Sequence, residues 1–129
     1  MSIEKKRKVA RLLGLPITDD TKEEVVYNQV DSMLKQSEVQ SGSFKGLNPV
    51  EVFNRFADMK ENLLHIKDLI KQAIQHSIYR VKPSGKVYEG EYEVAMDEDE
   101  LLKYLVDEDH QDDLIVLEKK LKTKKLASV

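Results

Sequence analysis

Apolar residues recur at helical spacing through the middle of the 129-residue chain, and this run constrains the fold most. Their separations alternate between four and three positions, which is typical of a helix with one continuous apolar seam. Asn48 and Pro49 are favoured residues for a helix start, so we expect one long amphipathic helix from Pro49 to near Ser77. The seam residues are Val52, Phe56, Met59, Leu63, Ile66, Ile70 and Ala73.

The apolar stripe of this helix is wider than a two-stranded coiled coil requires, because Phe53, Leu64 and Leu69 flank the seam. We therefore expect the helix to pack against a neighbouring helix of its own chain and against a second copy, giving a homo-oligomer. The alternative is an internal helical bundle without an oligomer, because short protein cores use the same spacing.

Two shorter helices are expected before the long one. Ser2 is the predicted N-cap of the first, and Gly14 ends it. Thr21 begins a Thr-x-x-Glu capping box that predicts the start of the second. Small residues fill positions 41–46, so we expect a loop there, with Phe44 folded back onto the core.

The hydrophobic period changes from helical to alternating after Ser77. Residues 78–82 and 86–94 flank a Pro-Ser-Gly turn, and this arrangement predicts a β-hairpin. The second strand is expected to pack its apolar face and to leave its glutamates in solvent. The residues of the predicted packed face are Tyr88, Tyr92 and Val94. Asp97 then predicts the N-cap of a further helix.

The last apolar run, residues 114–117, fits two structures. Its residue types favour a third strand, which we prefer, but Leu114, Leu117 and Leu121 also fit one face of a helix. Together these patterns predict an α+β, mainly α, fold. We expect a helical oligomerisation region at residues 1–77 and a small α+β module with an acidic loop and a basic tail at residues 78–129.

Charge is segregated along the chain, although the formal net charge is only −3. Residues 97–113 contain nine carboxylates and a single lysine, while the tail around residues 119–125 is basic. We expect the acidic module to dock a basic partner protein. The basic N-terminal segment offers an alternative, contact with nucleic-acid backbone. Its candidate contact residues are Lys5, Lys6, Arg7, Lys8 and Arg11.

Residues 8–16 look like the first helix and turn of a helix-turn-helix motif. The helix that would follow begins with Lys22, Glu23 and Glu24, and its carboxylates would repel phosphates. Sequence-specific DNA reading by this element is therefore not expected, and only a basic arm remains as the nucleic-acid alternative.

Residues 107–118 resemble a twelve-residue EF-hand calcium loop. Asp112 occupies the position where the sharp turn requires glycine, and the chain has no second loop to pair with this one. The resemblance makes a calcium-responsive protein with a single, divergent loop of this kind a second alternative. The candidate ligands are Asp107, Asp109, Gln111, Asp113 and Glu118.

The sequence contains no pattern that indicates catalysis or a cofactor. Its three histidines lie far apart, it has no cysteine, and no stretch is apolar enough for a membrane span or a signal peptide. We expect a non-enzymatic cytoplasmic assembly or adaptor protein without a cofactor. In layout, with a basic N-terminal helical segment, a central pair of oligomerising helices and a strand-containing C-terminal piece, the chain resembles the small DNA-packaging subunits of tailed phages. That resemblance implies a nucleic-acid-binding oligomer, for example a phage DNA-packaging or transcription accessory protein.

Overall fold

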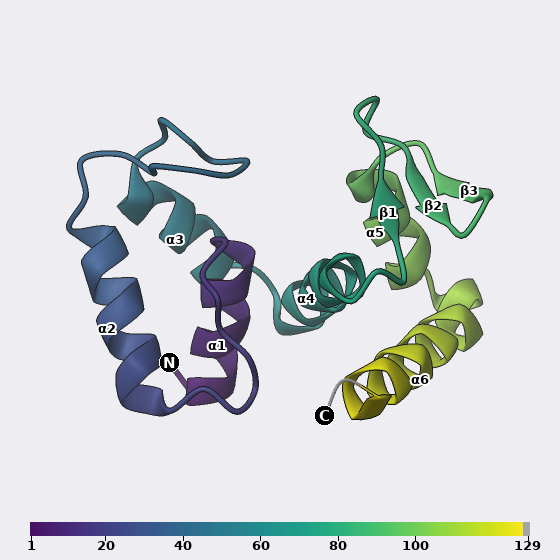
Figure 1. Ribbon diagram of the computed structural model, residues 1–129, viewed down its shortest axis with the longest axis horizontal. Coiled ribbons are helices and arrows are strands. Elements are labelled where there is room, and N and C mark those ends of the chain that lie inside the picture. The colour runs from purple at the N-terminus through teal and green to yellow at the C-terminus, as the bar shows by residue number, and fades with distance from the viewer. Residues whose placement is uncertain (128–129) are drawn as a thin grey trace. The chain divides into compact units, whose positions relative to one another are not determined.

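The computed structural model describes residues 1–127, which contain six α-helices, one short 3-10 helix and three strands (Figure 1). The expected α+β, mainly α, fold is confirmed. The chain divides into two compact units between Leu64 and His65, whereas the sequence led us to divide it after residue 77. Unit 1 comprises residues 1–64 and unit 2 begins at residue 65. Residues 128 and 129 of the expected C-terminal module lie outside the described residues.

Unit 1 contains three helices, α1 (Ile3–Leu12), α2 (Glu23–Leu34) and α3 (Pro49–Ala57). The Ser2 hydroxyl accepts a hydrogen bond from the Lys5 amide at 3.2 Å, so the predicted cap of α1 is confirmed. The predicted capping box of α2 is wrong. The N-cap residue is Lys22, which makes no side-chain cap, because the Thr21 hydroxyl instead accepts from the Thr18 amide at 2.9 Å and closes the preceding turn.

The core of unit 1 is built from all three helices, from the loops before α2 and α3, and from Leu64 in the first turn of the helix that follows α3. Val9 of α1 and Val52 of α3 are almost fully buried. The Phe44 ring meets the Phe56 ring edge to face, with centroids 5.5 Å apart, so the prediction that Phe44 folds back onto the core is confirmed. The Asn48 side chain accepts from the amides of Val50 and Glu51, which confirms the predicted start of α3.

The single long helix predicted from the apolar seam is wrong. α3 ends at Ala57, and α4 (Glu61–Gln75) begins after three non-helical residues. In one straight helix, Val52 and Leu64 would lie about 18 Å apart. With the interruption, both side chains belong to the same core cluster of unit 1. The spacing of the seam continues across the break, so periodicity alone did not reveal it.

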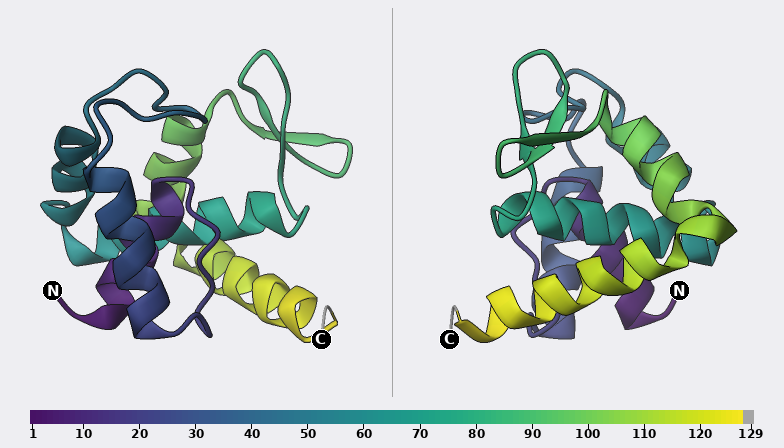
Figure 2. Two further views of the ribbon diagram at one scale, coloured as in Figure 1. Left: turned by 60° about the vertical axis from the view of Figure 1, so that its left-hand side comes forward. Right: turned by 90° about the vertical axis from the view of Figure 1, so that its right-hand side faces the viewer.

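Unit 2 consists of most of α4, a small sheet, two further helices and a short 3-10 helix. In both views of Figure 2, α6 lies alongside α4. The core of unit 2 combines residues from α4, the sheet, α5 and α6. These elements are β1 (Arg80–Val81), β2 (Val87–Glu89), β3 (Tyr92–Ala95), α5 (Glu98–Val106), η1 (Glu108–His110) and α6 (Gln111–Ala127).

The predicted hairpin is confirmed between β1 and β2, but the second predicted strand is divided in two. Gly90, with φ +62°, lies in a tight turn between β2 and β3, and the three strands pair antiparallel in the order β1-β2-β3. Val87 pairs with Ala95 and Tyr88 with Glu93, which leaves Val94 as an extra residue in β3.

This turn and this bulge change which side chains of the sheet are buried. Val87 and Ala95 are buried, whereas Tyr92 is 81% exposed. The predicted packed face of Tyr88, Tyr92 and Val94 is therefore wrong. The prediction assumed unbroken alternation, which a turn and an extra residue both interrupt.

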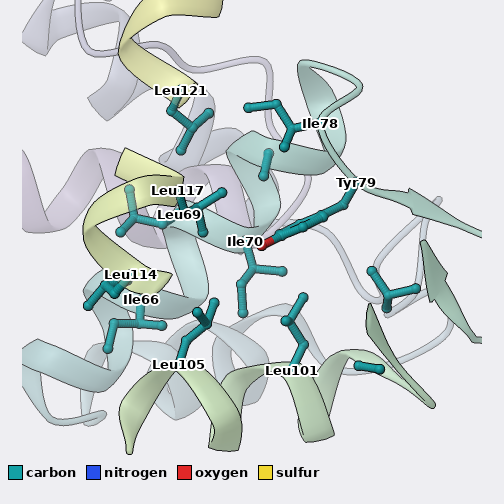
Figure 3. Packing of buried hydrophobic residues seen from close by; sticks show 13 residues of the cluster. Ile66, Leu69, Ile70, Ile78, Tyr79, Leu101, Leu105, Leu114, Leu117 and Leu121 are labelled. Carbon is teal, nitrogen blue, oxygen red and sulfur yellow. The ribbon is translucent and has the colours of Figure 1, made fainter. Parts of the chain in front are cut away.

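The third strand predicted at residues 114–117 is also wrong, because this run lies within α6. Figure 3 shows Leu114, Leu117 and Leu121 on the side of α6 that faces Ile66 and Leu69 of α4. All three leucines are buried, and their spacing is helical. The β-branched residues between them, which favoured a strand, are half exposed.

Candidate functional site

Unit 2 contains a pocket of about 330 Å³ between the sheet, α5 and α6. We call it the α5–α6 pocket. Leu101, Leu105 and Leu117 are buried side chains that form apolar walls. Val94 and Val116 are 39% and 47% exposed, and they also line it. The polar side chains of the pocket are Tyr79, Glu89, Tyr104, Asp113 and Lys120.

Tyr104 is held between α5 and α6 by three contacts. Its hydroxyl donates a hydrogen bond to the Asp113 carboxylate. Its ring stacks on the His110 ring, with centroids 3.8 Å apart and planes 14° apart. Its carbonyl oxygen lies 3.0 Å from His110 Nδ1. The α5 helix that carries Tyr104 begins as predicted, since the Asp97 carboxylate accepts from the Glu100 amide at 2.8 Å.

Tyr79 is the most buried polar residue of the α5–α6 pocket, with 6% of its surface exposed. Figure 3 shows its hydroxyl oxygen at the inner end of the ring, among the core side chains. Within residues 1–127, no protein group forms a hydrogen bond with this hydroxyl. Burial raises the pKa of Tyr79 to about 12, and the negative charges of Glu89 and Asp113 add to the effect. The hydrogen bond to Asp113 likewise raises the pKa of Tyr104.

Lys120 brings a positive charge to the same pocket. Its Nζ lies 2.7 Å from Glu89 Oε2, so this ion pair joins α6 to β2. Both side chains are partly exposed, and the pair is therefore expected to contribute little to stability. The pocket thus has two carboxylates, two phenols and one ammonium group around apolar walls, a set suited to binding a cation that has an apolar stem.

The basic residues predicted to contact nucleic acid have structural roles in three of five cases. Arg11 is buried, and its Nη1 lies 2.9 Å from Asp19 Oδ1. Arg7 donates two hydrogen bonds to the Thr21 carbonyl, at 3.2 and 2.8 Å. Lys6 Nζ lies 3.5 Å from the centre of the Tyr27 ring. These contacts hold the α1–α2 loop and α2 against α1. The other two predicted contact residues, Lys5 and Lys8, are partly buried.

The candidate calcium ligands do not lie in one loop, because η1 and α6 occupy most of residues 107–118. Asp107 accepts from the Asp109 amide at 2.9 Å, and Gln111 donates to the Asp107 carbonyl. Asp113 is bound to Tyr104, and Glu118 lies 3.8 Å from His65. Among residues 1–127, no group of three or more His, Cys, Asp or Glu side chains is placed to hold a metal ion.

The residues of the predicted oligomer seam are divided between the two units. Val52 and Phe56 are buried in unit 1, with Met59 packed against them. Ile66, Ile70 and Ala73 are buried in unit 2, and Leu63 is half-buried. An interface between copies along this seam would require side chains that already form the two cores.

Unit 1 has a pocket of its own, of about 390 Å³, between the end of α1, α2 and the loop after α2. Met33 and Val39 contribute apolar surface, and Asn28, Gln29 and Gln36 contribute amide groups. Among residues 1–127, no charged side chain lines it. This pocket therefore offers no charge complementarity to a basic or an acidic partner.

The sequence patterns did not single out the residues that form the α5–α6 pocket. Tyr79 and Glu89 belong to the predicted hairpin, no pattern includes Tyr104, and Lys120 is one of several lysines in the predicted basic tail. Asp113 alone was a candidate, as a calcium ligand. No motif joins these five residues, because only Asp113 and Lys120 share an element, α6, and the fold brings the other three to them.

Comparison with known proteins adds no relative, since no protein family model, no curated protein and no solved structure matches this chain. None of the helices described within residues 1–127 is both long enough and apolar enough to cross a bilayer. The function must therefore be inferred from the chemistry of the pocket and of the surface around it.

Proposed function

We propose that this chain is a non-enzymatic adaptor protein whose unit 2 binds a basic segment of a partner protein. The observation that carries the proposal is the α5–α6 pocket, in which carboxylates and phenols surround apolar walls. The exposed apolar side chains beside the pocket suit a polypeptide partner better than a free ion, because protein interfaces combine apolar contacts with a polar rim.

The charge of the segment that precedes the basic stretch of α6 supports a basic partner. Residues 78–113 contain twelve Asp and Glu residues and four Lys and Arg residues, a net charge of −8. The first turn of α5 includes Glu98, Asp99 and Glu100, all of them exposed. Such a surface speeds the approach of a positively charged partner and excludes acidic ones. The absence of cysteine suits a reducing compartment, so we place this function in the cytoplasm.

We do not propose self-association through the predicted seam, because its residues form the two internal cores. We also favour a protein partner over nucleic acid, since Arg7 and Arg11 are engaged within unit 1. The remaining lysines of α1 are expected to attract the DNA phosphate backbone only weakly.

Fluorescence anisotropy with three labelled probes tests the proposal. The probes are a short peptide of leucine and lysine, a peptide of the same length with glutamate in place of lysine, and a DNA duplex. We expect the full chain to bind the lysine peptide alone, with an affinity that falls as salt is raised. A matched pair of variants locates the binding. The double variant Glu98→Gln and Asp99→Asn should weaken it by roughly two- to tenfold, and Lys5→Ser with Lys8→Ser should leave it unchanged or slightly stronger.

Two results would overturn the proposal. Equal binding of the lysine and glutamate peptides would show that the acidic surface does not select its partner. Saturable binding of the DNA duplex that disappears in the Lys5→Ser, Lys8→Ser variant would instead support the nucleic-acid alternative.

A further inference from the structure

Lys120 shows how an ammonium group is accommodated at the α5–α6 pocket. Its Nζ lies 2.7 Å from Glu89 Oε2, and both residues line the pocket. Lys120 lies on the exposed side of α6, and 45% of its side chain remains accessible to solvent. The contact is therefore an exchangeable surface ion pair and not a buried structural one. A lysine from another molecule could take the same carboxylate without disturbing the core.

The pocket has two further acceptors, and no lysine within residues 1–127 is paired with either of them. Asp113 receives one hydrogen bond from Tyr104, and an ionised carboxylate has about four acceptor positions in all. Tyr79, of which 6% is exposed, also lines the pocket, and its hydroxyl makes no hydrogen bond within residues 1–127. A phenol oxygen that lines a pocket without a protein partner can accept a hydrogen bond from a ligand or from water.

Glu89, Asp113 and Tyr79 all line the same pocket, which brings their acceptor oxygens to one cavity of about 330 Å³. An ammonium group has three donors, matching two carboxylates and one phenol oxygen. The apolar walls formed by Leu101, Leu105 and Leu117 suit the four-carbon stem that carries that group. A single lysine side chain therefore suits both the acceptor oxygens and the apolar walls of the pocket.

We infer that the α5–α6 pocket is a receptor for one lysine side chain of the partner protein, and that Lys120 competes with that lysine for Glu89. The inference rests on the proposed adaptor function, and it names the group of the partner that is recognised. The incoming ammonium binds Asp113 and the Tyr79 oxygen, and Glu89 becomes its third acceptor once Lys120 leaves.

Competition between Lys120 and the incoming lysine can be tested by substitution. Removing the charge of Lys120 should strengthen binding of a positive ligand more than removing the charge of a nearby lysine that does not contact Glu89. Lys120→Met releases Glu89, and Lys122→Met serves as the control. Lys122 lies on the same helix, is exposed, and has the same charge, so both variants change the long-range field equally.

The probe is a short labelled peptide of neutral residues with one central lysine, compared with the same peptide containing norleucine. We expect the full wild-type chain to bind the lysine peptide more tightly than the norleucine peptide. Lys120→Met should raise the affinity for the lysine peptide about two- to fivefold above that of Lys122→Met, the range expected for release of an exposed ion pair. Asp113→Asn and Tyr79→Phe should each lower it, and circular dichroism should show that both variants keep the native helix content.

Equal affinities of Lys120→Met and Lys122→Met, or equal binding of the two peptides, would overturn the inference. The leucine–lysine peptide then separates this failure from that of the proposed function. If that peptide still binds with salt dependence, the acidic surface docks basic partners without a lysine receptor. If it does not bind either, both the inference and the adaptor function are wrong.

Discussion

The leucines of α6 allow a stringent test of the fold of unit 2. Leu114 and Leu117 are 9% and 2% exposed, whereas Ile115 between them is 49% exposed. Truncation of a buried leucine to alanine removes apolar contacts and leaves a cavity, at a cost of about 3 kcal/mol. Truncation of the exposed Ile115 should change the free energy of unfolding by less than about 0.5 kcal/mol. Leu114→Ala and Leu117→Ala should therefore each be severely destabilising, and Ile115→Ala nearly neutral.

The expected loss of about 3 kcal/mol is large relative to the total stability of unit 2. Unit 2 is a domain of modest size, with a total stability on the order of 5 kcal/mol. Each leucine variant should therefore lower the urea midpoint of unit 2 by about half or more. Urea unfolding followed by the near-ultraviolet tyrosine signal reports on this unit, since four of the five tyrosines lie in it.

The same three variants distinguish a helix from a strand at residues 114–117. Positions 114 and 117 point to opposite faces of a strand but to one face of a helix. If Ile115→Ala costs as much as Leu117→Ala while Leu114→Ala is neutral, the segment is a strand and the packing described for unit 2 is wrong.

Three further predictions concern single residues. Arg11→Ala should destabilise unit 1 by roughly 1–3 kcal/mol, because it removes a buried side chain and its ion pair with the exposed Asp19, while Lys8→Ala should have little effect in the same thermal melt. Asn48→Ala should cost about 1 kcal/mol in urea unfolding, since it removes the acceptor for two amides at the start of α3, and an unchanged midpoint would refute the cap. Because the pKa of Tyr79 is raised to about 12, the unfolded chain loses this proton first, so stability should fall by up to about 2 kcal/mol between pH 10 and 12. Tyr79→Phe should remove this part of the alkaline dependence in urea titrations, and an identical pH profile would contradict it.

Local signals in the sequence predicted the helix starts well. The caps at Ser2, Asn48 and Asp97 were all confirmed, because each depends on residues only two or three positions apart. The Thr21 cap failed although its pattern was equally good, since a neighbouring turn competed for the same hydroxyl. Such competition between local hydrogen bonds is not visible in a capping motif alone.

Patterns that depend on tertiary packing were less reliable. The apolar spacing continues unchanged across the break between α3 and α4, so the break follows from packing Val52 and Leu64 into one core. Ile115 and Val116 favoured a strand by residue type, but they occupy the exposed face of α6, where packing does not depend on them. The charge cluster of α1 also did not reveal that Arg11 is buried and pairs with Asp19 in the loop after α1.

The candidate site could not be derived from the sequence. The spacing of its polar residues matches no motif, since Asp113 and Lys120 lie on α6 while Tyr79, Glu89 and Tyr104 lie elsewhere in unit 2. Only the acidic character of the C-terminal module was evident beforehand, and it pointed to the chemistry of the partner without locating the pocket.

The central claim is that unit 2 docks a basic segment at the α5–α6 pocket. The most direct measurement is a titration of the ¹⁵N-labelled full chain with the leucine–lysine peptide, followed by two-dimensional NMR. The account predicts saturable shifts at the amides around Glu89, Tyr104 and Asp113, with those of α1 unchanged. Saturable shifts confined to α1 or to the pocket of unit 1, with residues 79–120 unaffected, would contradict it.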